Sequence, residues 1–164
     1  MKRIYFISML LFASIVSFAQ TDSMAPYWKN KNLPAFTLLT PDTAFFSNEN
    51  LVKGKNTIFM LFNPECEHCQ KQFEQLVKMP EVINNAQLVM CSTELMDKIK
   101  VFYNKFHLEN YPFVHLGKDY KVFLGSFFQP KTVPVVVIYD KQNQFRFISQ
   151  GQATRKQIVE ALTN

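Results

Sequence analysis

The chain has 164 residues, and 48% of them are hydrophobic, including 17 phenylalanines. Its 18 basic and 13 acidic residues give a mild formal net charge of +5 at pH 7, and no basic stripe is interleaved with aromatic side chains, so we exclude nucleic acid as a partner. Three cysteines are too few for a disulfide-stapled scaffold, and a chain of this length can instead fold as one domain around a hydrophobic core.

Residues 1–19 have the pattern of a secretory signal peptide. Lys2 and Arg3 precede an uncharged apolar run over residues 4–19, and Ser17 and Ala19 occupy the −3 and −1 positions of a cleavage site. We therefore predict export to the periplasm or another extracytoplasmic compartment, without stable membrane insertion after cleavage. A retained anchor is the alternative. Cleavage would leave 16 basic and 13 acidic residues.

Residues 20–32 form a polar segment that we expect to be a flexible lead-in, followed by one domain over residues 33–164. An apolar run at residues 56–62 predicts a strand buried on both faces. After it, Cys69, Phe73, Leu76 and Val77 recur at helical spacing, so a helix should begin near Cys66. Cys66 and Cys69 thus lie where a buried strand passes into a helix.

The rest of the chain alternates strand and helix signals. We expect strands at residues 86–92, 133–140 and 145–149, and helices at residues 94–108, 121–128 and 154–162. Residues 141–144 are the turn of an antiparallel hairpin. This order predicts an α/β fold with a mostly parallel sheet, covered by helices on both faces, and an antiparallel hairpin at its edge.

The stretch Cys66-Glu67-His68-Cys69 is the strongest chemical signal in the chain. A helix N-terminus carries a partial positive charge, which favours the thiolate of Cys66. Cys66 would then attack a disulfide, and the more buried Cys69 would resolve the mixed disulfide. A cationic His68 would stabilise the thiolate further, and Glu67 would oppose it weakly.

A strand that ends in C-x-x-C, a helix, and a later Val133-Pro134 that opens a β-rich strand together resemble the thioredoxin superfamily. The interval between Cys69 and Pro134 leaves room for an extra strand–helix insert. With the export signal and a lead-in strand at residues 34–38, the layout is similar to the TlpA/ResA-like exported thiol-disulfide oxidoreductases. The resemblance covers residues 33–162 and implies a thioredoxin-like fold with a central mixed sheet.

The resemblance also implies roles for single residues. Cys66 is the implied nucleophile, Cys69 the resolving thiol, and Pro134 a cis-proline facing the disulfide. Val133 would offer its backbone to an extended substrate segment, and Gly151 matches a glycine near the end of the last strand. The implied activity is dithiol–disulfide exchange on protein substrates without a cofactor, in the reducing direction, with electrons from an extracytoplasmic donor. A disulfide-forming oxidant or isomerase is the alternative within this class.

Three positions depart from the family pattern. Glu65 stands where an aromatic residue usually precedes the first cysteine, Met60 where thioredoxins carry a buried Asp, and Gln72 where ResA-like members carry a Glu. Both usual proton acceptors for the second thiol are therefore replaced. Between the cysteines, Glu67 is similar to ResA-like reductases and His68 to DsbA-like oxidants, so the direction of electron flow stays open.

Other functions compete with redox exchange. Cys66, His68, Cys69 and Cys91 include soft ligands, so a copper-delivery or metal-binding module is an alternative. A structural disulfide would close only a short loop and would stabilise the fold little. A peroxiredoxin-type peroxidase would need Pro and Thr or Ser where Phe59 and Asn63 stand. We expect Cys91, in an apolar strand, to behave as a small hydrophobe.

Overall fold

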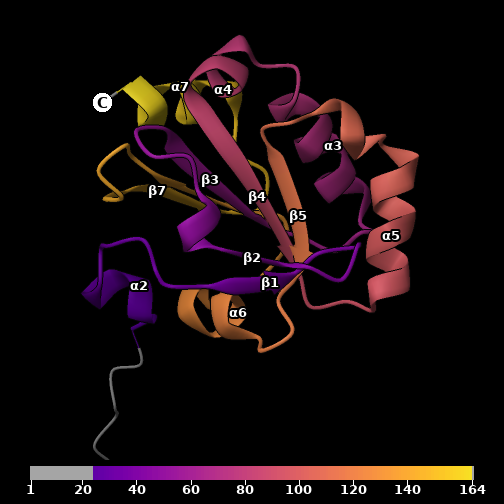
Figure 1. Cartoon of the computed structure of the whole chain (residues 1–164). Helices are drawn as coiled ribbons and strands as arrows, with labels where there is room; N and C mark the ends of the chain where they lie inside the picture. The colour runs from indigo at the N-terminus through magenta and orange to yellow at the C-terminus, as the bar shows by residue number, and fades with distance from the viewer. Residues whose placement is uncertain (1–23, 164) are drawn as a thin grey trace, which may run out of the picture.

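A seven-stranded mixed sheet runs through the middle of the computed structural model, which describes residues 24–163 (Figure 1). Its strands lie in the order β2-β1-β5-β4-β3-β6-β7. Their bounds are Thr37–Leu39 (β1), Phe45–Ser47 (β2), Asn56–Leu61 (β3), Ala86–Ser92 (β4), Val114–Lys118 (β5), Val135–Tyr139 (β6) and Phe145–Gln150 (β7). The predicted signal peptide lies outside the described residues.

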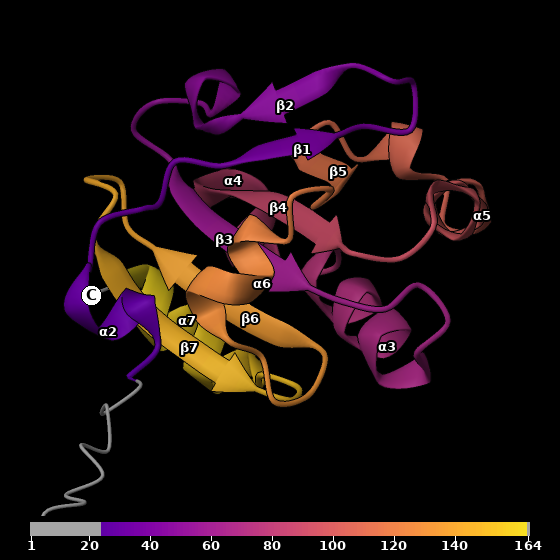
Figure 2. The same cartoon turned by 90° about the horizontal axis from the view of Figure 1, so that it is seen from below.

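Helices cover both faces of this sheet, as predicted (Figures 1 and 2). One face carries α3, α4, α5 and α7, and the other carries α2 and α6. Their bounds are Pro26–Lys29 (α2), Glu67–Leu76 (α3), Pro80–Asn85 (α4), Met96–Lys105 (α5), Phe123–Phe128 (α6) and Arg155–Thr163 (α7), with short 3-10 turns at Asn48–Asn50 and Leu108–Asn110. No helix within residues 24–163 is long and apolar enough to cross a membrane.

Strand β3 is buried along its whole length, as its continuous apolar run predicts. Because successive side chains of a strand point to opposite faces, β3 supplies both halves of the core. Ile58 and Met60 join the cluster under α3 and α5, while Phe59 and Leu61 join the cluster under α2 and α6. Strand β3 therefore anchors both layers of helices.

The sheet is mixed, as the resemblance implied, but the prediction from the element order that it would be mostly parallel was wrong. Only the β3–β4 and β4–β5 pairings are parallel, and β6 runs antiparallel to β3. A parallel neighbour requires a connection that returns the chain to the starting end of the sheet. The connection through the six-residue α6 does not do so, because β6 begins at Val135 opposite Leu61, the last residue of β3.

Three short elements had no clear sequence signal. Strand β5 contains His115 and Gly117, which interrupt its apolar pattern, and β2 has only three residues. Helix α4 has only six residues and begins at Pro80. Two strand–helix units, β4–α5 and β5–α6, fill the interval between Cys69 and Pro134 where room for an insert was predicted.

The described part of the predicted lead-in packs against α6 and the β6–β7 hairpin. Tyr27 is buried, with its ring centroid 6.0 Å from that of Phe128 and 5.7 Å from that of Phe145. The Nζ atom of Lys31 lies 4.1 Å from the ring centroid of Trp28, and the Phe145 N–H donates to the Lys31 carbonyl oxygen at 2.8 Å. These contacts dock α2 on the domain.

Gly117 marks a close approach between β5 and β1, and this approach can be tested. A Cβ atom at position 117 would lie 2.7 Å from Leu38 Cβ and 3.1 Å from the Leu39 carbonyl oxygen. We predict that Gly117→Ala lowers the free energy of unfolding by about 1–3 kcal/mol, because the two strands must separate. Urea unfolding measures the loss.

Gly125→Ala is the matched control. Position 125 lies within α6, and the nearest atom to an added Cβ there is Val122 Cγ1 at 3.3 Å. Alanine favours the helix by about 1 kcal/mol over glycine, so this variant should be as stable as the wild type or slightly more stable. An equal loss of stability in both variants would contradict the close approach at β1.

Candidate active site

Cys66 and Cys69 lie where β3 passes into α3, as predicted. Cys66 is the N-cap residue of α3, and its carbonyl oxygen accepts a hydrogen bond from the Gln70 N–H at 3.0 Å. The Cys66 N–H donates to the Asn63 carbonyl oxygen at 3.1 Å, which closes the turn after the strand. Cys66 thus stands at the positive end of a ten-residue helix.

The two thiols differ in exposure. Cys66 is half-buried, whereas Cys69 is fully buried in the cluster under α3 and α5. Burial raises the pKa of the Cys69 thiol to about 12; the neighbouring Cys66 side chain also raises it, and a hydrogen bond from the Asn63 main chain lowers it. An accessible thiol therefore stands in front of a buried one that ionises poorly at neutral pH.

Pro134 and Gly151 meet at the same edge of the sheet. Pro134 is buried, follows a cis peptide bond from the half-buried Val133, and accepts a hydrogen bond from the Gly151 N–H at 2.9 Å. The next residue, Gln152, donates from Nε2 to the His68 carbonyl oxygen at 3.3 Å. The structure therefore connects the proline loop to the first turn of α3 through residues 151–152.

Glu67 and His68, the two residues between the cysteines, are both exposed. Glu67 Oε1 lies 2.6 Å from Lys71 Nζ one turn further along the helix, and this lysine lowers the pKa of the Glu67 carboxyl. His68 contributes its main chain to the site through Gln152. Solvent weakens the influence of exposed charges on the thiols, so neither side chain dominates the site electrostatically.

Met60 and Gln72, which stand at the positions of the usual proton acceptors, are both fully buried. They belong to the same face of the sheet as Cys69, but a thioether and an amide do not take up a proton at neutral pH. Gln72 Oε1 accepts a hydrogen bond from the Ala153 N–H at 2.7 Å, and its Nε2 has no partner among the described residues. This link was not predicted. The signal for it in the sequence is a glutamine three residues after Cys69, within the predicted helix.

Cys91 lies on the opposite face of the sheet from Cys69, in the cluster under α6. It is buried, and burial together with the nearby Asp119 raises the pKa of its thiol well above the usual value. The sheet separates Cys91 from the cysteine pair, which agrees with its expected role as a small hydrophobe. Within residues 24–163, no three His, Cys, Asp or Glu side chains gather as a metal site.

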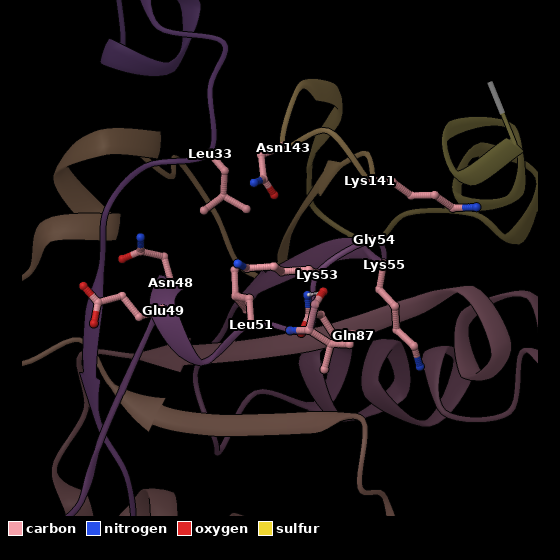
Figure 3. A pocket seen from close by; sticks show the side chains of 11 residues that line it. Leu33, Asn48, Glu49, Leu51, Lys53, Gly54, Lys55, Gln87, Lys141 and Asn143 are labelled. Carbon is pink, nitrogen blue, oxygen red and sulfur yellow. Dashed lines mark hydrogen bonds between the residues drawn. The ribbon is translucent and has the colours of Figure 1, made fainter.

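A polar cavity of about 420 Å³ lies at the other end of the sheet (Figure 3). Its lining includes Gly54 just before β3, Gln87 at the start of β4, and Asn143 in the turn between β6 and β7. The Lys55 and Lys141 side chains extend away from the cavity (Figure 3). Because Cys66 follows the far end of β3, this cavity is not part of the cysteine site.

No protein-family model and no curated protein sequence matches the chain. Solved structures do resemble it. A secreted disulfide oxidoreductase of Mycobacterium tuberculosis, homologous to E. coli DsbE, matches with a TM-score of 0.62 at 17% identity, over 77% of this chain and 92% of that one. StoA from Bacillus subtilis matches with a TM-score of 0.58 at 18% identity, over 80% and 98%.

A thioredoxin-like protein from Aeropyrum pernix matches with a TM-score of 0.61 at 17% identity, over 77% of this chain and 87% of that one. Each similarity extends over most of both chains, so it concerns the whole fold rather than one supersecondary unit. The chain therefore has a thioredoxin-like fold.

Proposed function

We propose that the chain is a thiol–disulfide oxidoreductase that uses Cys66 and Cys69 on protein substrates. One observation carries the proposal: the half-buried Cys66 is the N-cap residue of α3, and the fully buried Cys69 lies three residues after it. The fold supports the proposal, since the Mycobacterium tuberculosis protein of similar structure is a disulfide oxidoreductase.

The reaction would proceed in two exchanges. The Cys66 thiolate attacks one sulfur of a substrate disulfide, so that a mixed disulfide forms and the other substrate sulfur leaves as a thiolate and takes a proton from water. Cys69 then loses its proton and attacks Cys66 Sγ, which releases the second substrate thiol. Two electrons pass from the cysteine pair to the substrate, and the pair ends as a disulfide.

The edge formed by Val133 and Pro134 is the proposed substrate platform. Val133 is half-buried and exposed enough to offer its main chain to an extended peptide, while Pro134 is buried beneath it. Backbone hydrogen bonds to a peptide would bind diverse sequences, because they use no side chain of the substrate. This mode suits an enzyme that acts on many proteins.

We further propose that the pair works in the reducing direction, as in TlpA/ResA-like proteins, and that an extracytoplasmic donor returns its electrons. A strong oxidant needs a highly stabilised thiolate in its reduced form. The exposed His68 supplies little of that stabilisation, because solvent screens its charge. Export rests on the pattern of residues 1–19 and agrees with the secreted neighbour of similar fold.

Cysteine variants test the proposal directly. We predict that Cys66→Ser abolishes insulin-disulfide reduction, with a loss of at least about 100-fold, because the nucleophile is gone. Cys69→Ser should instead accumulate the mixed disulfide, which non-reducing electrophoresis and mass spectrometry detect. Cys91→Ala is the matched control and should keep full turnover, since Cys91 lies across the sheet. Turnover that survives Cys66→Ser would refute the proposal.

The raised pKa of Cys69 predicts a steep pH dependence for the second exchange. Below a pKa of about 12, the thiolate fraction rises about tenfold for each pH unit, so resolution of the mixed disulfide should accelerate in proportion between about pH 6 and 9. Rapid-quench measurement of the decay of a preformed mixed disulfide gives this rate. A rate that is level above pH 7 would contradict the poorly ionised Cys69.

Gln72→Glu should flatten that profile. A carboxylate at position 72 keeps an acceptor for the Ala153 N–H and adds a proton acceptor one turn along α3 from Cys69. We predict faster resolution at pH 7, by about tenfold. Gln75→Glu makes the same change of charge further along the helix and should leave the rate unchanged.

A further inference from the structure

Four polar contacts form a closed ring beside Cys66. Asn63 Nδ2 donates to Glu94 Oε1 at 2.9 Å, and Glu94 Oε2 lies 3.7 Å from Lys98 Nζ. Lys98 Nζ donates to Glu65 Oε2 at 2.6 Å, and the Glu65 N–H donates to Asn63 Oδ1 at 2.8 Å, which closes the ring. The ring joins the turn after β3 to the first turns of α5, which lies beside α3 (Figures 1 and 2).

Asn63 links this ring to both cysteines. Its carbonyl oxygen accepts the Cys66 N–H at 3.1 Å, and its main chain acts to lower the pKa of the Cys69 thiol, against the larger effect of burial. Its side chain is a member of the ring: Oδ1 accepts the Glu65 N–H, and Nδ2 donates to the Glu94 carboxylate. A displacement of Asn63 would therefore disturb the turn that positions Cys66.

Lys98 offsets part of the negative charge of the ring. It is the one cation between two carboxylates, and its side chain and that of Glu94 are 39% and 33% exposed, so solvent screens them only in part. Without Lys98, the negative charges of Glu65 and Glu94 would stand uncompensated near Cys66. Their field would disfavour the thiolate that performs the attack.

The other ion pairs near the site are of a different kind. The Glu67–Lys71 pair joins residues one turn apart on α3, the Glu74–Lys78 pair joins α3 to the second residue after its end, and both pairs are well exposed. Such pairs contribute little and hold no second element in place. The ring through Asn63 and Lys98, by contrast, connects the cysteine turn to helix α5.

We propose that Asn63 and Lys98 are positioning residues for the cysteine pair: the ring holds Cys66 in place against α5, and Lys98 offsets part of the negative charge of the two glutamates. The inference rests on the proposed function in taking Cys66 as the reactive thiol. It adds two residues, outside the C-x-x-C stretch, on which the reactivity of that thiol depends.

A double-mutant cycle, with the alkylation rate of Cys66 as its readout, tests the proposal. The rate of alkylation of the reduced protein by iodoacetamide is measured at pH 7, and mass spectrometry assigns the modified cysteine. Asn63→Ala and Lys98→Met should each slow alkylation of Cys66 by about two- to fivefold, the range of a partly exposed charge interaction. The double variant should be no slower than the slower single variant, because either change opens the same ring.

Three further variants complete the design. Lys98→Arg keeps the cation and should restore the wild-type rate. Asn63→Asp keeps the shape and the acceptor for the Glu65 N–H but faces Glu94 with a second carboxylate, so it should slow alkylation even if Asn63→Ala fails to fold. Lys78→Met removes a lysine that lies just beyond the C-terminal end of α3, away from Cys66, and should leave the rate unchanged.

Additive losses in the double variant, no rescue by Lys98→Arg, or equal slowing by Lys78→Met would overturn the ring proposal. The outcome is separate from that of the proposed function, because alkylation needs no protein substrate. If the wild type does not reduce insulin while the ring variants still slow alkylation, the oxidoreductase proposal fails and the ring proposal stands. If the ring variants are alkylated at the wild-type rate while the wild type reduces insulin normally, the ring proposal fails and the oxidoreductase proposal stands.

Discussion

The antiparallel pairing of β6 with β3 is the constraint on which the site depends. It places Val135 opposite Leu61, so the chain before β6 lies beside the chain after β3. The first of these segments carries Pro134 and the second carries Cys66. The next pairing, of β7 with β6, brings Gly151 to the same edge, where its N–H donates to the Pro134 carbonyl oxygen. A parallel β6 would have placed the proline at the other end of the sheet.

The environment of the pair separates the two sulfurs chemically. Cys66 lies at a helix N-terminus within reach of solvent, while Cys69 lies in the core that α3 and α5 share. Burial disfavours the Cys69 thiolate, and the adjacent Met60 and Gln72 positions supply no carboxylate. The difference between the sulfurs thus arises from packing, whereas the nearby charged groups, Glu67 with Lys71 and Lys98 with two glutamates, lie nearer the surface.

Helix α5 contacts the cysteine site from both its buried side and its outer side. Helix α5 packs Ile99 and Phe102 into the core that also buries Cys69, and from its outer side it sends Lys98 back to the cysteine turn. One helix therefore shares its core with the proposed resolving thiol, Cys69, and contacts the turn that carries the proposed nucleophile, Cys66. This double use gives α5 a direct place in the proposed redox chemistry.

Local sequence patterns were sufficient for the cysteine pair, its strand and helix, and the final hairpin. Continuous apolar runs and helical spacing are determined by neighbours in the chain, and they survive in the structure as β3, α3, β6 and β7. The direction of β6 and the existence of β5 depend on how distant segments pack, so the same patterns did not reveal them.

Polar contacts across the fold were equally inaccessible from the sequence. Asn63 and Glu94 are 31 residues apart, Glu65 and Lys98 are 33 apart, and Gln72 and Ala153 are 81 apart. Nothing in the composition around Asn63 distinguishes it from an ordinary turn residue before Pro64. Its importance appears only when α5 lies beside the turn.

The reduction potential of the Cys66–Cys69 couple in the purified domain tests the central claim most directly. Equilibration with glutathione buffers of known ratio, followed by quantification of the reduced and oxidised forms, gives this potential. A reductant that depends on a dedicated electron donor should have a value of about −270 mV or lower. A value of about −180 to −120 mV would contradict the reducing direction and identify the protein as an oxidant or isomerase.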